Sequence, residues 1–136
     1  MKKIILALSM GLAFASHAAG WPDRAVNIIV PFPAGGSTDT VARAMAQSMG
    51  DQLGKPFVVE NRPGATGTIG AGAVKRAPAD GYTLMVASLG PFVITPHLVK
   101  SVPYDAAKDF DKWAHLSGSF PITANASFEM VATRDD

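Results

Sequence analysis

The sequence predicts an α/β domain built on a parallel sheet, and three observations support this. Short apolar runs rich in β-branched residues, typical of buried strands, alternate with segments of helical character in the order strand, helix, strand, helix, strand. A loop rich in Gly, Ser and Thr follows each predicted strand. After the first 18 residues, no stretch of the chain is apolar for long enough to cross a bilayer.

The first predicted strand and helix carry the clearest signals. Residues Ala25–Phe32 form an apolar, β-branched run that prolines close. Ser37 or Thr38 is expected to cap the helix that follows, and Asp39 lies in its first turn, where a carboxylate suits the positive helix end. Apolar residues then recur at spacings of three and four until Gly54, which is the expected stop signal.

The rest of the domain alternates in the same way. Phe57–Glu60 is the second predicted strand, and Tyr82–Ala87, the most apolar run, is the third. Between them, Thr66–Arg76 is a predicted helix whose glycines each lower helix propensity by up to about 1 kcal/mol, so a backbone or ligand should approach it closely. Pro91–Val99 is expected to form a short helix that breaks near Pro96. In a sheet of this kind, ligands bind beyond the carboxyl ends of the strands.

The start of the chain, Met1–Ala18, has the features of a signal peptide. Lys2 and Lys3 give it a positive beginning, and Ile4–Ala15 is an apolar run of about a dozen residues. Small residues place the expected cleavage after Ala18. An uncleaved membrane anchor is the alternative, which the shortness of the apolar run disfavours.

The net charge and the content of cysteine and histidine limit the classes of partner and site that this chain can have. Without the two leader lysines, ten basic residues face eleven acidic ones, and this net charge of −1 argues against nucleic acid as a partner. The chain has no cysteine, which fits a bacterial periplasm and excludes thiol catalysis and zinc–thiolate sites. The two histidines after the leader, His97 and His115, are eighteen positions apart with no cluster of ligands beside them, so no metal or other cofactor is expected.

Three loops of small residues follow the three predicted strands. They are PAGGSTD (Pro33–Asp39), NRPGATGT (Asn61–Thr68) and SLGP (Ser88–Pro91). Small residues expose backbone N–H groups, and a helix N-terminus adds unpaired donors and a positive dipole end. Two such ends facing one cleft would hold a carboxylate or phosphate without Lys or Arg. Any one loop alone is better explained as an ordinary turn or cap, but three in register favour a ligand site.

Several motifs, in order along the chain, resemble those of a known receptor family. They are Trp21-Pro-Asp-Arg, IIVPFPAGGSTDTVAR (Ile28–Arg43), GKPFVVENRPGATGTIGA (Gly54–Ala71), APADGYTLMVAS (Ala77–Ser88), and Pro103-Tyr-Asp with Lys108-Asp-Phe. Together they cover about Trp21–Phe110 and resemble the Bug-type, or tripartite tricarboxylate transporter, substrate-binding receptors.

The resemblance implies a fold, a function and a set of site residues. Such receptors are periplasmic, two-lobed α/β proteins with a type II periplasmic binding protein fold. They capture small carboxylates or related metabolites without bond chemistry and deliver them to membrane permease subunits. Their first-lobe loops hold a ligand carboxyl group through backbone amides, hydroxyls and bridging waters. On the matching positions, the implied ligand-binding residues are Phe32, Ala34, Gly35, Gly36, Ser37, Asp39, Gly64, Ala65, Thr66, Gly67 and Ser88.

The chain departs from the family pattern in two ways. It is shorter than the family's chains, so the second lobe is expected to be absent, and residues 112–136 no longer resemble the stretch after the family's Lys-Asp-Phe. The expected division is therefore a signal peptide over 1–18, a partial N-terminal ligand-binding lobe over 19–111, and a divergent or frameshifted tail over 112–136. A truncated fragment without ligand binding is the main alternative to a receptor.

Individual side chains leave further alternatives open. Arg62 could bind a carboxylate, although an arginine in such a turn is more often solvated or holds the loop. Asp39 could contact an amine of the ligand or only stabilise its helix. Trp21 and Trp113 are expected to pack rather than to serve as stacking platforms. A small hydrolase is a lesser alternative, because Ser37 lacks the Gly-x-Ser-x-Gly elbow, and no Gly-Lys-Ser/Thr follows to make a phosphate-loop NTPase.

Overall fold

The computed structural model describes residues 20–120 and 123–134, with side chains described over 20–111 and 130–134. The predicted leader, Met1–Ala18, lies outside the described residues. Within them, no helix has both the length and the apolar character needed to cross a bilayer. The elements are β1 (Val26–Val30), α1 (Ser37–Leu53), β2 (Phe57–Asn61), η2 (Ala65–Gly67), α2 (Thr68–Lys75), β3 (Thr83–Ser88), η3 (Gly90–Ile94), α3 (Thr95–Leu98), β4 (Phe110–Phe120) and β5 (Thr123–Thr133).

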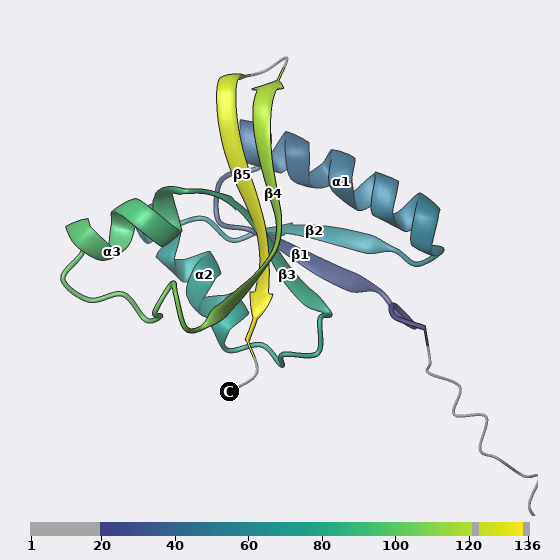
Figure 1. Cartoon of the computed structure of the whole chain (residues 1–136), viewed down its shortest axis with the longest axis horizontal. Helices are drawn as coiled ribbons and strands as arrows, with labels where there is room; N and C mark the ends of the chain where they lie inside the picture. Colours follow the sequence, from purple (N-terminus) through teal and green to yellow (C-terminus); the bar gives the residue numbers. More distant parts are fainter. Residues whose placement is uncertain (1–19, 121–122, 135–136) are drawn as a thin grey trace, which may run out of the picture.

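The five strands form one mixed sheet in the order β2-β1-β3-β5-β4 (Figure 1). Strand β1 runs parallel to both neighbours, with Ile28 opposite Val59 of β2 and Leu84 of β3. The parallel α/β arrangement that the sequence predicts is therefore confirmed. Strand β5 then joins β3 in antiparallel fashion and β4 joins β5, a pairing that the sequence did not predict.

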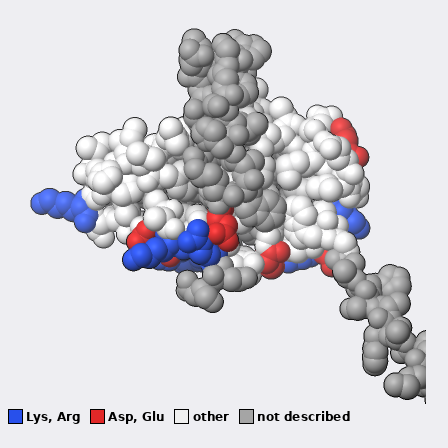
Figure 2. Space-filling view, viewed as in Figure 1, with Lys and Arg blue, Asp and Glu red and all other residues white. Residues whose placement is uncertain are grey.

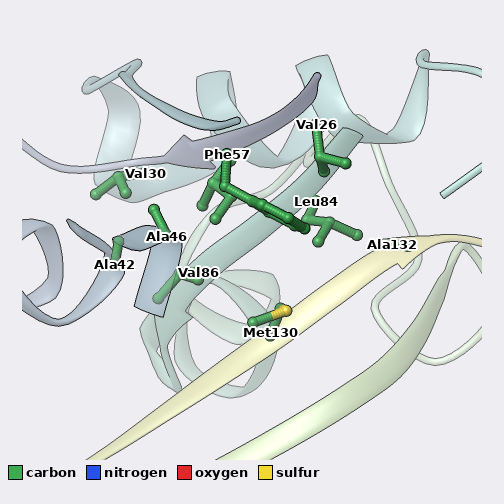
Figure 3. Close-up of a cluster of buried hydrophobic side chains, with 10 residues drawn as sticks. Val26, Val30, Ala42, Ala46, Phe57, Leu84, Val86, Met130 and Ala132 are labelled. Atoms are coloured by element: carbon green, nitrogen blue, oxygen red, sulfur yellow. The ribbon is translucent and has the colours of Figure 1, made fainter. Parts of the chain in front are cut away.

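Helices cover both faces of the sheet and create two cores. Alternate residues of β1 and β3 point to opposite faces, because side chains alternate along a strand. On the face covered by α1, the cluster drawn in Figure 3 contains Val26, Ile28, Val30, Ala42, Ala46, Phe57, Leu84, Val86, Met130 and Ala132. On the other face, α2 packs in a cluster of Ile29, Ala71, Val74, Met85, Ala87, Tyr104, Phe110 and Val131. Burial on both faces explains why β1 and β3 are apolar almost throughout.

The predicted end of helix α1 is confirmed, whereas its predicted N-cap is wrong. Gly54 ends it with a φ of 68°, as expected of a left-handed cap. The expected cap by Ser37 or Thr38 is wrong, because the N-cap is Gly36, in an extended conformation and without a side-chain hydrogen bond. Both hydroxyl residues already lie inside the helix. The first turn of α1 therefore begins without a side-chain acceptor for its amides.

The second helix begins later than expected. The sequence predicts a helix over Thr66–Arg76, but regular α-helix starts at Thr68, because the residues of η2 have positive φ. The close approach that its glycines imply is confirmed. A Cβ added at Gly70 would lie 2.8 Å from Pro31 Cβ and 3.1 Å from the carbonyl oxygen of Arg62. Small residues thus let α2 pack against the loops that follow β1 and β2.

The base of the β4–β5 hairpin is tied to the rest of the domain. Thr133 Oγ1 donates a hydrogen bond to the carbonyl of Val74 in α2, at 2.6 Å. Arg134 forms an ion pair with Asp111 at 2.7 Å and donates to the carbonyl of Ala107 at 3.1 Å. Figure 1 shows the other end of the hairpin running beyond the edge of the remaining sheet. The described contacts therefore anchor the hairpin at its base.

Candidate functional site

The three predicted loops meet at one edge of the sheet. We call them the first loop (residues 31–36), the second loop (62–67) and the third loop (88–91). They follow β1, β2 and β3, whose parallel directions bring their carboxyl ends together. Gly67 of the second loop shows how closely they pack, because a Cβ there would lie 2.7 Å from Pro91 Cγ and 3.5 Å from Pro31 Cβ. The second loop therefore contacts both of the others.

A cavity of about 300 Å³ opens where the loops meet. Its lining includes Phe32 of the first loop, Thr66 of the second and Ser88 of the third. These are three of the sequence-predicted site residues, one from each loop. The remaining lining residues come from the third loop, η3, α3 and the residue after it: Gly90, Pro91, Ile94, Thr95, Leu98 and Val99. We refer to this hollow as the loop cavity.

A buried carboxylate organises the first loop. Asp39 is 3 % exposed, and its Oδ2 accepts hydrogen bonds from the N–H of Gly35 at 2.8 Å and from Arg43 Nε at 3.0 Å. Its Oδ1 accepts one from Asn61 Nδ2 at 2.9 Å, and the same nitrogen also donates to the carbonyl of Phe32 at 3.1 Å. The network joins the first loop to the end of β2.

The ionisation of Asp39 follows from this network. The hydrogen bond from Arg43 is the largest cause, and those from Gly35 and Asn61 add to it, so the pKa of Asp39 falls from 3.8 to about 2 despite burial of the carboxyl group. Both carboxylate oxygens already accept hydrogen bonds within the protein. The geometry thus favours a role for Asp39 in holding the first loop over contact with an amine of a ligand.

Backbone strain marks the second loop. Four consecutive residues have φ in the left-handed region: Gly64 at 127°, Ala65 at 44°, Thr66 at 55° and Gly67 at 93°. For Ala and above all for β-branched Thr, this conformation costs on the order of 1 kcal/mol or more per residue. Strain of this kind concentrates at functional sites, where the surrounding structure holds it in place. All four residues belong to the sequence-predicted site.

Two helices begin at this edge without a side-chain cap. The N-cap residues are Gly36 for α1 and Gly67 for α2, and neither of them provides a side-chain hydrogen bond to the amides of its helix. In α1 the N–H of Thr40 is bonded to the carbonyl of Gly36, which leaves the N–H groups of the preceding turn without helical partners. Gly35 and Gly36 are exposed beside them. Such a helix start attracts anions.

Cationic side chains near the loops are already paired. Arg62 forms an ion pair with Glu60 at 2.7 Å, and the hydrogen bond that Arg62 donates to this carboxylate raises the pKa of Arg62. Arg43 is bound to Asp39 and Asn61. Among the residues whose side chains are described, no Lys, Arg or His lines the loop cavity, and no cluster of three His, Cys, Asp or Glu could hold a metal. An anion in the cavity would therefore depend on amides and hydroxyls.

A second hollow, larger than the loop cavity, lies elsewhere in the domain. It has a volume of about 590 Å³ between α1 and β2, and its lining includes Gln47, Asp51, Lys55 and Phe57. None of the eleven predicted site residues lines it. Trp21 contacts the rings of Phe57 and Tyr82, as expected of a packing residue, whereas the side chain of Trp113 lies outside the described ones.

The sequence missed the wall of the loop cavity that η3 and α3 provide. Ile94, Leu98 and Val99 line it although they are exposed large apolar residues, at 55, 78 and 39 %. Thr95 Oγ1 also donates to the carbonyl of Thr66 at 3.4 Å, which links α3 to the second loop. The available signal was the apolar run directly after the third loop, which a fully solvated helix would not carry.

Comparison with known proteins identifies relatives over most of the chain. A family model described as "Tripartite tricarboxylate transporter family receptor" matches residues 41–133. The match thus includes β4 and β5, part of the tail that the motif resemblance did not cover. Protein BugT of Bordetella pertussis is 43% identical over 106 residues, which cover 77% of this chain and 32% of BugT.

Solved structures give the same picture. The periplasmic binding protein BugD aligns with a TM-score of 0.68 and 44% identity over 71% of this chain and 32% of BugD. MatC from Rhodopseudomonas palustris with bound malate aligns with a TM-score of 0.67 and 43% identity over 71% of this chain and 33% of MatC. The chain therefore spans about a third of the length of the relatives it matches.

Proposed function

This chain belongs to the tripartite tricarboxylate transporter family of receptors, and we propose that it captures a small carboxylate-type metabolite in the periplasm. The bound ligand would pass to the membrane permease subunits of such a transporter. The single observation that carries the proposal is the loop cavity, because Phe32, Thr66 and Ser88 bring the three loops to one small space. The malate held by the MatC neighbour supports a carboxylate as the ligand class. The predicted leader over residues 1–18 would export the chain.

The proposed mechanism is reversible capture without bond chemistry. Amides at the start of α1, next to Gly36, and the hydroxyl of Ser88 donate hydrogen bonds to the ligand carboxylate. Hydrogen bonds to a charged group contribute about 1.5 to 3 kcal/mol each. Because folding already holds the strained second loop in place, its ordering adds no cost when the ligand binds.

The predicted site residues divide by what they would do. Phe32, Thr66 and Ser88 would contact the ligand, because they line the loop cavity. Ala34, Gly36 and Ser37 would supply amides at the start of α1, whereas the N–H of Gly35 is already bonded to Asp39. Residues 64–67 would shape the second loop through their positive φ, with Gly67 packed against Pro91. Asp39 would hold the first loop rather than the ligand.

A fragment without ligand binding is the second candidate. The observation that favours it is the small share of its relatives' length that the chain matches, which is 32% for BugT. In a longer receptor, a second lobe would close over the loop cavity and add groups to the site. A hydrolase is disfavoured by two observations. The family is a class of solute receptors and not of enzymes. Ser37, the residue that suggested a hydrolase, lies inside α1 and does not line the loop cavity.

Calorimetric titration of the chain over residues 19–136 with small carboxylates, malate and hexanoate among them, tests the proposal. We expect the carboxylates to bind saturably. Hexanamide, which has the same carbon chain as hexanoate but no charge, should not bind. Gly36→Phe should abolish binding, because its side chain would cover the first-turn amides of α1. The fold should tolerate it, since Gly36 has a φ of −76° and a Cβ there would meet only the carbonyl of Pro33, at 3.5 Å.

The matched control is Gly20→Phe, in which the same change occurs where a Cβ would meet nothing within 4 Å. Affinity should be unchanged in this variant. Equal affinity of Gly36→Phe and the parent chain would contradict the loop assignment. Absence of binding by a chain that unfolds cooperatively would favour the fragment.

A further inference from the structure

The hydroxyl groups of the loop cavity gather near the second and third loops, and the wall that η3 and α3 provide beyond Thr95 is apolar. These hydroxyl groups belong to Thr66, Ser88 and Thr95. The other side chains of the cavity, on the first loop, η3 and α3, are apolar, and Ile94 and Leu98 are more than half exposed. Figure 2 shows that the surface over η3 and α3, at the left of the view, is mostly white, with one blue side chain projecting at its far left end. A ligand in the cavity would therefore touch polar groups at one end only.

The polar end has few donors left for a ligand. Thr66 Oγ1 donates to the carbonyl of Ala65 at 2.6 Å, and Thr95 Oγ1 donates to the carbonyl of Thr66 at 3.4 Å. Among the three hydroxyls, this leaves the hydroxyl of Ser88. It would act together with the amides at the start of α1, which the first loop connects to Phe32 in the lining. These donors are enough for one carboxylate group, which accepts up to four hydrogen bonds.

Among the described side chains, none that lines the loop cavity is basic, so a second carboxylate would have no cation there to pair with. Arg43 is bound to Asp39 and Asn61, and Arg62 is bound to Glu60. A carboxylate placed against Ile94 and the rest of the apolar wall would lose water without gaining a partner, which is unfavourable.

We propose that this site selects a monocarboxylate with an apolar carbon body, aliphatic or aromatic, over compact di- and tricarboxylates. The carboxylate lies at the loops, and the carbon body covers Ile94, Leu98 and Val99. This inference rests on the proposed function, since it names the ligand class of the same site. The exposed apolar wall then serves to recognise the ligand, because burial against it removes apolar surface from water.

Three carboxylates separate the contributions. Acetate has the carboxylate alone, hexanoate adds an apolar chain, and adipate has the same chain length as hexanoate with a second carboxylate at its far end. Calorimetric titration of the chain over residues 19–136 should show hexanoate binding about tenfold more tightly than acetate, since four partly buried methylenes reach that ratio. Adipate should also bind about tenfold more weakly than hexanoate, because its second carboxylate would lose water against the apolar wall. Malate and citrate should bind no more tightly than acetate.

Variants of Leu98 test the apolar wall. The side chain is 78 % exposed, so its replacement should leave the fold intact. We expect Leu98→Asn to remove most of the hexanoate advantage while the affinity for acetate is unchanged, and Leu98→Lys to shift the preference toward adipate. Leu53→Asn is the matched control, because Leu53 is also exposed but lies outside the loop cavity.

The outcomes distinguish the two proposals. Adipate, malate or citrate binding as tightly as hexanoate would overturn the selectivity and leave carboxylate capture standing. Unchanged selectivity in Leu98→Asn would also overturn it. If a cooperatively folded chain bound no carboxylate at all, capture itself would be wrong and the selectivity with it.

Discussion

The first and second loops lie at the same sheet edge but are held by different forces. A polar network holds the first loop, in which the buried carboxylate of Asp39 accepts hydrogen bonds from Arg43 and Asn61. Strained backbone and close packing hold the second loop, in which Gly67 fits against Pro91. The first loop should therefore respond to charge and pH, and the second to the volume of an added side chain.

The largest expected effect is that of Gly67→Ala. A Cβ at Gly67 would lie 2.7 Å from Pro91 Cγ, and the φ of 93° is strained for any residue but Gly. Overpacking and backbone strain together should lower the free energy of unfolding by about 3 kcal/mol. Chemical denaturation measures this. The control is Gly36→Ala, because φ at Gly36 is −76° and an added Cβ would lie 3.5 Å from the nearest atom, the carbonyl oxygen of Pro33. Its free energy of unfolding should change by less than about 1 kcal/mol. Equal effects of the two variants would show that packing does not hold the second loop.

A smaller effect is expected for Asp39→Asn in the first loop. The substitution keeps the shape but removes the charge that Arg43 contacts, and the amide cannot accept from both the Gly35 N–H and Asn61 as a carboxylate does. Loss of hydrogen bonds to a buried charge should lower the free energy of unfolding by about 2 kcal/mol. Asp51→Asn, an exposed position of the same helix, should change it by less than about 0.5 kcal/mol. A cost no larger than that of the control would contradict the network.

The third loop extends the comparison, because one buried hydroxyl holds it. Tyr104 is 5 % exposed, and its hydroxyl donates to the carbonyl of Pro91 at 2.6 Å. Tyr104→Phe leaves this carbonyl without its donor and should lower the free energy of unfolding by about 1.5 kcal/mol. Phe92→Leu, at a nearby and partly buried position, is the control for a general loss of packing. Both variants should lower the free energy of unfolding, but only Tyr104→Phe should also weaken carboxylate binding, because Pro91 lines the loop cavity. Unaltered binding in Tyr104→Phe would separate the hydroxyl from the site.

The smallest expected effect is the pH response of the first loop. Folding lowers the pKa of Asp39 from 3.8 to about 2, so its contribution to stability is present above pH 4 and is lost as the pH falls toward 2. Because the Arg43 side chain is 53 % exposed, solvent screening should reduce this contribution to about 1 kcal/mol. Lysine contacts also lower the pKa of Asp109, so the parent chain must be compared with Asp39→Asn. Parallel pH profiles of the two proteins would contradict the prediction.

Local signals predicted the parts of the fold that depend on neighbouring residues. The three parallel strands, the end of α1 at Gly54 and the gathering of the loops at one edge all follow from apolar runs and turn residues. The start of α2 did not follow, because contacts from Pro31 and Pro91 hold Gly67 and its neighbours in a conformation that Ala65 and Thr66 do not favour.

Nonlocal contacts account for the features that the sequence left undetermined. The antiparallel pairing of β5 with β3 joins Leu84 to Ala132, which are far apart in the chain and carry no local signal of their register. The same holds for the loop cavity. Phe32, Thr66 and Ser88 were candidates from their loops, but only the packing of α3 beside the second loop adds Leu98 to the lining.

The most direct test of the central claim is a titration of the ¹⁵N-labelled chain with hexanoate, followed by amide NMR shifts. We expect saturable shifts confined to the three loops, the start of α1 and the apolar wall over η3 and α3, with those of Gly36 and Ser88 among the largest. Shifts confined instead to the hollow between α1 and β2, at Gln47 and Lys55, would contradict the assignment of the loop cavity as the carboxylate site.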